Sequence, residues 1–188
     1  MKTLIIFAHP NPKSFSAAIL ERVTTLLTAK NCEYKISDLY DMNFNSVLSS
    51  NDFIAMNKGT YSIDIISEMH KINWAEQIVM IYPIWWTGMP AIMKGYIDRV
   101  FAKGFAYDYI DDALIGLLSK KVVIINTMGT KNSYYDHSGM TSAMKMTLND
   151  GIIEMCGMKT KHHLLLGNVP SASSEERQQM LLKIDKLF

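Results

Sequence analysis

The sequence predicts an α/β protein in which a five-stranded parallel sheet lies between layers of helices. Short apolar runs recur along the 188 residues, each followed by a polar or Gly/Pro-containing turn and a segment of helical period. No internal repeat and no Pro-, Gly- or Ser-rich linker divides the chain, so we expect residues 1–188 to form one domain. The strongly apolar runs, typical of buried parallel strands, are Leu4–Ala8, Ile78–Tyr82, Val122–Asn126 and Leu164–Leu166.

The first helix follows the first strand, with Ser14 or Ser16 placed to cap its start. Its apolar face is made by Phe15, Ala18, Ile19, Val23, Leu26 and Leu27. The next segment, Cys32–Asp38, alternates polar and apolar residues, which predicts a half-exposed strand at the edge of the sheet. Between this strand and the next we expect a short helix at Ser50–Met56 and a second around Ile63–Ile72.

Three further helices complete the predicted elements. One follows Pro90, a residue tolerated in a first helical turn, and shows apolar residues at helical spacing from Ile92 to Phe101. Another carries the stripe Met140, Met144, Leu148, Ile152 and Met155, ends at Gly157, and is interpreted as core rather than as a metal site. Ser173 and Glu176 form a capping box for the last helix.

Composition excludes several classes of function. The 19 basic and 18 acidic residues give a net charge of +1, which disfavours dedicated nucleic-acid binding. The longest apolar run, Ile78–Trp86, contains Pro83 and is shorter than the roughly 20 residues of a membrane-spanning helix. The two cysteines, Cys32 and Cys156, form neither a CxxC pair nor a zinc motif, so we expect a reducing, cytoplasmic location.

Ligands of open parallel sheets bind beyond the carboxyl ends of the strands, which directs attention to the loops after the first, third and fourth strands. The first of these loops, His9–Ser16, combines the cation Lys13, the hydroxyls of Ser14 and Ser16, and a helix N-terminus. These groups suit a phosphate, although serines at this position more often only cap a helix. The loop is neither a GxGxxG nor a Walker A motif.

The other two loops favour a flat ligand. Two adjacent tryptophans, Trp85 and Trp86, follow the third strand, where at least one of them cannot face the core. The loop Asn126–Thr130, followed by Tyr134 and Tyr135, offers backbone donors and phenols to the edge of a ring. A planar, phosphorylated ligand with hydrogen-bonding edges fits all three loops.

With these motifs the chain resembles the flavodoxin-like NAD(P)H:quinone oxidoreductases of the DT-diaphorase type over nearly its whole length. The motifs are Ala8-His9-Pro10 with Ser14-Phe15, then Pro83-x-Trp85-Trp86-x-Gly88-x-Pro90-Ala91-x-x-Lys94-Gly95-x-x-Asp98-Arg99-Val100-Phe101, then Gly104-Phe105-Ala106-Tyr107 and Cys156-Gly157. The resemblance implies a flavodoxin-like three-layer sandwich with sheet order 2-1-3-4-5. It also implies a non-covalent flavin and ping-pong chemistry, in which NAD(P)H gives a hydride to the flavin and a quinone or similar electrophile takes one from the same place. FMN is favoured because no residues mark an adenosine site, with FAD as the alternative.

The resemblance also implies roles for particular residues. The phosphate-side loop is His9, Lys13, Ser14, Phe15 and Ser16; the isoalloxazine segment is Pro83, Ile84, Trp85 and Trp86; the pyrimidine-side loop is Thr127, Met128, Gly129 and Thr130. Family members are usually homodimers with the active site at the subunit interface. Tyr107 and Tyr109 are therefore expected to reach over the partner's flavin and, with Trp86, to contact the substrate.

Tyr135 is the candidate phenol that stabilises charge on the reduced flavin. The vertebrate enzymes of the family carry a histidine six residues later, and an ungapped count from Tyr135 reaches Thr141. Either His137 takes this role through a shifted loop, or proton delivery is left to Tyr135 and water. The third loop also departs from the family's two-glycine version, since Gly129 stands alone there.

Three alternative functions stay open: a flavin-bearing regulatory subunit of a glutathione-gated potassium efflux system, a one-electron carrier, and an azoreductase. A carrier of the flavodoxin type is disfavoured because such proteins are usually acidic and lack the tryptophan pair. Outside the site, His70 is expected on a helix surface, and His162 and His163 in the last strand are interpreted as non-ligands. Lys94, Asp98 and Arg99 are interpreted as surface or dimer-contact charges.

Overall fold

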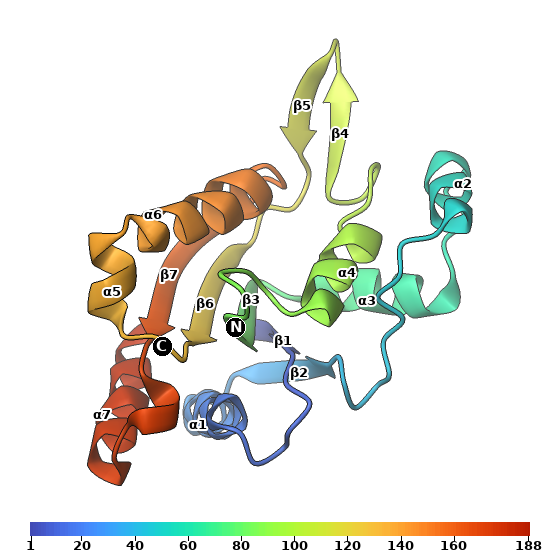
Figure 1. Ribbon diagram of the computed structural model, residues 1–188. Helices are drawn as coiled ribbons and strands as arrows, with labels where there is room; N and C mark the ends of the chain where they lie inside the picture. The colour runs from blue at the N-terminus through green and yellow to red at the C-terminus, as the bar shows by residue number, and fades with distance from the viewer.

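The computed structural model describes residues 1–188, and a five-stranded parallel sheet forms its centre (Figure 1). The strands lie in the order β2-β1-β3-β6-β7. Their bounds are β1 Lys2–Phe7, β2 Glu33–Asp38, β3 Gln77–Pro83, β6 Lys121–Thr127 and β7 Lys159–Leu166. Counted over the sheet strands alone, this is the expected order; the numbering differs because a hairpin, β4 and β5, lies between β3 and β6 in the chain.

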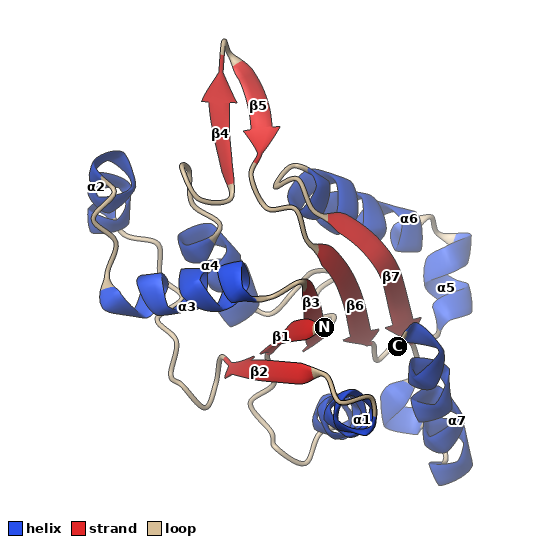
Figure 2. Ribbon diagram, turned by 180° about the vertical axis from the view of Figure 1, so that it is seen from behind, coloured by secondary structure: helices blue, strands red, loops and turns tan.

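Two layers of helices cover the sheet (Figures 1 and 2). On one face lie α1 (Phe15–Ala29) and α7 (Ser174–Ile184), and on the other α3 (Ile63–Trp74), α4 (Ala91–Val100) and the helical run of α6 (Met140–Lys145) and η1 (Met146–Glu154). Successive strand residues point to opposite faces, so that Leu4 packs in one apolar core and Ile5 in the other. Both residues are fully buried.

The predicted helix starts are confirmed in detail. Ser14, rather than Ser16, caps α1, since its Oγ accepts the N–H of Ala17 at 3.1 Å. At the start of α7, Ser173 N–H donates to Glu176 Oε2 at 2.7 Å and Glu176 N–H donates to Ser173 Oγ at 3.2 Å. Both arrangements satisfy N–H groups that the first turn of a helix leaves without backbone acceptors.

The edge strands differ in how well they match the prediction. β2 is a half-exposed edge strand, as expected, with only Ser37 buried. β7 begins at Lys159, five residues before the apolar run at Leu164 and three before His162, which was also expected in this strand. The first half of β7 is polar and partly exposed at the other edge of the sheet, so an apolar-run criterion misses it.

The helix predicted from the methionine stripe is present, but its second half is a π-helix, Met146–Glu154. Met144 and Leu148 are buried as expected, whereas Met155 is 45% exposed, so its interpretation as a core residue is wrong. A π-helix has i→i+5 hydrogen bonds, and the buried residues Leu148 and Ile153 are five positions apart. The change of period moves Met155 out of the core.

A hairpin of β4 (Tyr107–Ile110) and β5 (Ala113–Gly116), which was not predicted, projects from the body (Figure 1). Its two-residue turn places Asp111 and Asp112 at φ 50° and 62°, without the Asn-Gly signal typical of such turns. At the base of the hairpin, Gly116 lies so close to the backbone of Gly157 that a side chain would clash. The remaining short elements are α2 (Ser50–Lys58), α5 (Asn132–His137), η2 (Val169–Ser171) and η3 (Asp185–Leu187). No helix has the length and apolar character needed to cross a membrane.

Arg99 is buried, so the surface interpretation of this residue is wrong. Its guanidinium donates to Asp52 Oδ1 at 2.9 and 3.0 Å, to Asp64 Oδ2 at 3.1 Å and to the carbonyl of Asn45 at 2.8 Å. Arg99 thereby joins α2, α3 and α4. Lys94 and Asp98 form an ion pair that is partly exposed, as expected of a helix surface.

Candidate functional site

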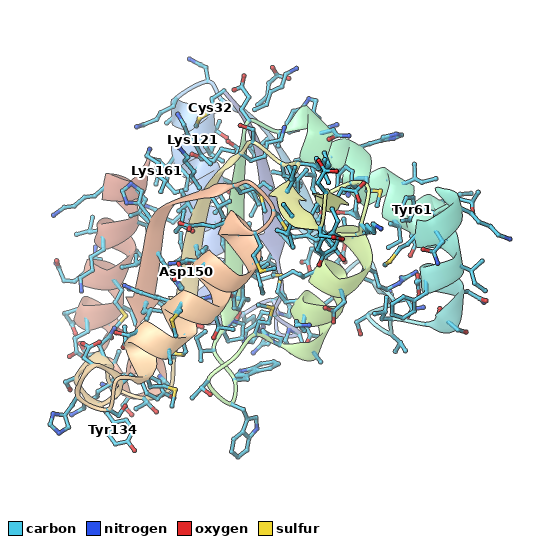
Figure 3. All side chains as sticks on the ribbon, turned by 90° about the horizontal axis from the view of Figure 1, so that it is seen from above. Cys32, Tyr61, Lys121, Tyr134, Asp150 and Lys161 are labelled. Atoms are coloured by element: carbon cyan, nitrogen blue, oxygen red, sulfur yellow. The ribbon has the colours of Figure 1, made fainter.

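The three loops singled out in the sequence meet in one cleft at the carboxyl ends of β1, β3 and β6. In Figure 3 the label Tyr134 marks this end of the sheet, and the label Lys121 marks the opposite end. The cleft encloses about 450 Å³, a size suited to a small-molecule cofactor. Its lining residues are His9, Phe15, Ser16, Pro83, Ile84, Trp85, Trp86, Thr127, Met128, Gly129, Thr130, Tyr135, Val169 and Pro170.

All but two of the residues expected to bind the cofactor line this cleft. The exceptions are Ser14, whose hydroxyl is engaged in capping α1, and Lys13, whose side chain is exposed. Val169 and Pro170 were missed. They follow β7, and they reach the cleft because β7 pairs with β6 and because Val169 N–H donates to the carbonyl of Met128 at 3.1 Å.

His9 forms one wall of the cleft in a defined protonation state. Its Nδ1 accepts the N–H of Asn11 at 3.0 Å, which requires Nδ1 to be unprotonated. Burial lowers the pKa of His9 below its ordinary value, and the neutral ring carries its proton on Nε2. The ring packs edge-on against Trp85, with ring centres 6.0 Å apart.

Trp85 and Trp86 are held at the mouth of the cleft by a tight turn. Trp85 and Gly88 exchange backbone hydrogen bonds of 2.9 and 3.0 Å. Trp86 and Thr87 between them adopt φ 50° and 60°, a left-handed conformation that is costly for a residue with a Cβ. At least one tryptophan was expected to lie outside the core, and in the structure neither is buried: Trp85 is 42% exposed and Trp86 fully exposed. Strain of this kind is often stored at ligand sites.

The cleft presents backbone N–H groups without protein acceptors, contributed by all three loops. They belong to Phe15, Ser16, Trp86, Gly129 and Thr130. Those of Phe15 and Ser16 lie in the first turn of α1, where the helix dipole favours an anion. Those of Gly129 and Thr130 can donate to the carbonyl edge of a ring. Free donors on three loops around a cleft with aromatic lining residues fit a planar ring system that carries a phosphate.

Tyr135 and His137 are separated by the structure. Tyr135 lines the cleft and packs beside Met128 and Met144. His137 is exposed at the end of α5 and does not line the cleft. Thr141, the residue in register with the family's histidine, donates its hydroxyl to Asp136 at 2.7 Å. Of Tyr135 and His137, only Tyr135 can therefore reach a ligand in the cleft.

Tyr107 and Tyr109 do not line the cleft of their own chain. They lie on the β4–β5 hairpin with ring centres 6.1 Å apart in an edge-on arrangement. Both line a separate apolar groove of about 360 Å³ with Phe53 of α2, Phe101 and Met155. Tyr107 and Tyr109 could therefore contact a ligand only in the cleft of a second copy of the chain. No three His, Cys, Asp or Glu side chains gather as a metal site would.

A family model described as a flavodoxin-like fold matches residues 1–188. An "Uncharacterized NAD(P)H oxidoreductase" of Haemophilus influenzae is 36% identical over 183 residues, which cover 96% of this chain and 91% of the relative. NAD(P)H dehydrogenase (quinone) 1 of Rattus norvegicus is 31% identical over 201 residues, covering 96% of this chain and 73% of the relative. Among solved structures, the NAD(P)H:quinone oxidoreductase from Methanothermobacter marburgensis superposes with a TM-score of 0.90 at 29% identity, over 99% of this chain and 96% of that one.

Proposed function

This chain belongs to the flavodoxin-like fold family and is an NAD(P)H:quinone oxidoreductase, and on that premise we propose that the cleft at the ends of β1, β3 and β6 holds FMN. The observation that carries the proposal is the set of free backbone N–H groups that three loops contribute to one cleft with aromatic lining residues. The regulatory-subunit alternative has no support from the relatives, which are named as oxidoreductases or dehydrogenases.

When bound, the flavin supplies two-electron hydride transfer between NAD(P)H and the acceptor. The protein contributes binding and orientation. The N-terminal turn of α1 receives the phosphate through the N–H groups of Phe15 and Ser16, and the exposed Lys13 adds positive charge at the rim. The turn that carries Trp85 and Trp86 would hold the ring, and the fully exposed Trp86 at the cleft mouth is available to a second planar molecule.

We assign charge stabilisation to the loop after β6. Preorganised donors aimed at developing negative charge are the largest contribution of a protein to such a step. Gly129 and Thr130 offer their N–H groups, and Tyr135 offers a phenol in the same part of the cleft. Proton delivery then rests with Tyr135 and solvent, since His137 lies outside the cleft.

The choice between FMN and FAD turns on a neighbouring cavity of about 300 Å³ that shares His9 with the cleft. It is lined by Tyr40, Asp38 and Asp41 at the end of β2. Carboxylates at the end of a neighbouring strand can bind ribose hydroxyls, so this cavity is the place for the adenosine of FAD. Asp38 Oδ1 accepts the N–H groups of Tyr40 and Asp41 at 3.2 Å each, whereas Oδ2 has no protein partner. FAD therefore stays the alternative, and we keep FMN as the proposed cofactor on the fit of the main cleft alone.

We further propose that the active enzyme is a cytoplasmic homodimer of single-domain subunits, residues 1–188. Trp86 at the cleft mouth and Tyr109 and Ile110 on the hairpin expose large apolar surfaces. Pairing two copies would cover these surfaces and bring Tyr107 and Tyr109 of one copy to the cleft of the other, where they would contact the substrate together with Trp86.

The test is an anaerobic visible-spectrum titration of the purified protein supplied with FMN or FAD. Addition of NADH or NADPH should bleach the flavin bands, and addition of a simple benzoquinone should restore them. Mass spectrometry of the released cofactor identifies FMN or FAD, and sedimentation velocity gives the oligomeric state. Failure to bind either flavin would overturn the cofactor proposal, and a bound flavin that ignores both nicotinamides would overturn the assignment of the cleft to catalysis.

A further inference from the structure

A chain of hydrogen-bonded polar side chains, with Asn126 buried and His163 and Asn149 half-buried, crosses the sheet beside the cleft. The Asn126 Nδ2 amide donates to the carbonyl of Tyr82 at 3.1 Å. Its Oδ1 lies 2.8 Å from Nε2 of His163. On the other side of the imidazole, Nδ1 lies 3.1 Å from the side-chain amide of Asn149. The chain therefore joins β3, β6, β7 and the π-helix η1.

The protonation state of His163 follows from these partners. Because Asn126 uses its NH₂ group on Tyr82, the oxygen that faces His163 must receive a proton from Nε2. Burial, and the nearby charge of Lys145 on α6, lower the pKa of His163 to about 4. Nδ1 is then an acceptor, and the Asn149 amide must turn its NH₂ group towards it. The other titratable group beside the ring is the phenol of Tyr82, and burial raises the pKa of that phenol above its ordinary value.

The position of this chain relates it to the cofactor loops. Tyr82 immediately precedes Pro83, where the tryptophan loop leaves β3, and Asn126 immediately precedes Thr127, where the third loop begins. A small cavity of about 170 Å³ is lined by Tyr82, Asn126 and His163 on one side and by Thr87 and Gly88 of the strained turn on another. Ile84 is shared between this cavity and the cleft. The imidazole thus supports both loops from behind without reaching the cleft.

We propose that His163 is a positioning residue that holds the carboxamide of Asn126 in one orientation and thereby sets the separation of the two cofactor loops. The proposal rests on the assignment of the cleft to a flavin. A hydrogen-bonded asparagine between two parallel strands would otherwise be free to rotate its amide, and the Tyr82 carbonyl would lose its donor. Neighbouring groups that orient those in direct contact with a ligand commonly change binding by an order of magnitude when removed.

The test uses the whole chain and three substitutions. His163→Leu removes both ring nitrogens, His163→Gln keeps an N–H donor for Asn126, and His162→Leu on the same strand is the matched control, because His162 makes no side-chain hydrogen bond. FMN affinity is measured by quenching of flavin fluorescence. Hydrogen exchange of the amides of residues 83–88 and 127–130 is measured in the flavin-free protein.

We expect His163→Leu to weaken FMN binding about tenfold and to raise amide exchange in both loops, and His163→Gln to recover most of the affinity. His162→Leu should change neither. Asn126→Asp keeps an acceptor for His163 but loses the donor to the Tyr82 carbonyl, and it should behave like His163→Leu. It replaces His163→Leu in the test if that variant does not fold. A His163→Leu protein, or in its place an Asn126→Asp protein, with wild-type FMN affinity and unchanged loop exchange overturns the proposal. A wild-type chain that binds no flavin overturns the assignment of the cleft instead.

Discussion

Ser16 Oγ lies 3.0 Å from Thr127 Oγ1, and both residues line the cleft. Ser16 belongs to the first turn of α1 and Thr127 is the last residue of β6, so this hydrogen bond joins the first and third loops across 111 residues of chain. Both side chains are buried, at 1% and 7% exposure. The two ends of the cofactor site are therefore coupled through a pair of hydroxyls that have no other side-chain partner.

A double-mutant cycle should detect this coupling. Ser16→Ala and Thr127→Val each remove one hydroxyl, and each should lower the free energy of unfolding by about 1 to 2 kcal/mol because the remaining hydroxyl is left buried and unpaired. The double variant should be little worse than either single one. Urea unfolding of the flavin-free protein measures all four species. Additive effects, within about 0.5 kcal/mol, would contradict the coupling.

The strained turn predicts a stabilising substitution. Thr87→Gly relieves a left-handed conformation that costs about 1 to 2 kcal/mol, against about 0.5 to 1 kcal/mol of added entropy in the unfolded chain. We expect the free energy of unfolding to rise by about 0.5 to 1 kcal/mol. Gln178→Gly is the control, since Gln178 is exposed within α7 in helical conformation and should lose stability on the same change. Chemical denaturation measures the free energy of unfolding of both variants, and a loss of stability in both would argue against strain at Thr87.

Tyr135 and His137 should differ sharply in their effect on turnover. Tyr135→Phe removes a donor within the cleft and should lower kcat about 10- to 100-fold while FMN stays bound. His137→Ala should leave kcat within about twofold, because this side chain lies outside hydrogen-bond reach of the cleft. Steady-state kinetics with NADH and a soluble benzoquinone test both. The reverse pattern would assign proton delivery to His137.

The Arg99 cluster should make stability depend on pH. Burial raises the pKa of Asp52, but hydrogen bonds from Ser49 and Arg99 outweigh it, and the net pKa lies below its ordinary value. The pKa of Asp64 is lowered in the same way by Ser62 and Arg99. A depressed pKa in the folded state contributes stability above the unfolded value of about 4, and this stability is lost as the pH falls through the folded pKa.

Arg99→Leu should therefore destabilise the protein by about 3 kcal/mol at pH 7, since it leaves the Asp52 carboxylate without its buried partner. It should also flatten the fall in stability between about pH 5 and pH 2. Lys94→Leu, at the exposed ion pair on the same helix, should change stability by less than about 1 kcal/mol. Urea midpoints across this pH range measure both effects. An unchanged pH slope in Arg99→Leu would mean that the carboxylates owe their pKa to other neighbours.

The parts of the fold that sequence predicts well are those buried on both sides. Strands β3 and β6 lie in the middle of the sheet, and their apolar runs have no other explanation. The hairpin was missed because neither of its strands buries a full face and its turn uses Asp111 and Asp112 in place of glycine or asparagine. The burial of Arg99 was missed because its partners, Asp52 and Asp64, lie 47 and 35 residues away.

The parts of the site that could be predicted are the loops that come directly after a buried strand. The loops after β1, β3 and β6 could be located by counting from each apolar run, and they meet as parallel topology requires. Pro170 could not be found in this way, because it follows the edge strand β7 and its place at the cleft depends on a backbone hydrogen bond between the neighbouring Val169 and Met128 of another loop. The His163 chain was likewise out of reach, since alternation within a strand does not reveal which polar groups meet across three strands.

The free backbone N–H groups of residues that line the cleft belong to Phe15, Ser16, Trp86, Gly129 and Thr130. An alanine scan of the cleft would leave every one of these N–H groups in place. Ligand binding can therefore tolerate changes in many side chains as long as the loops keep their shape, and variants that no longer bind FMN should arise more readily from substitutions that bend the main chain, such as proline, than from loss of any one side chain. Under the proposed assignment, cofactor binding depends more on the conformation of these loops than on the identity of their side chains.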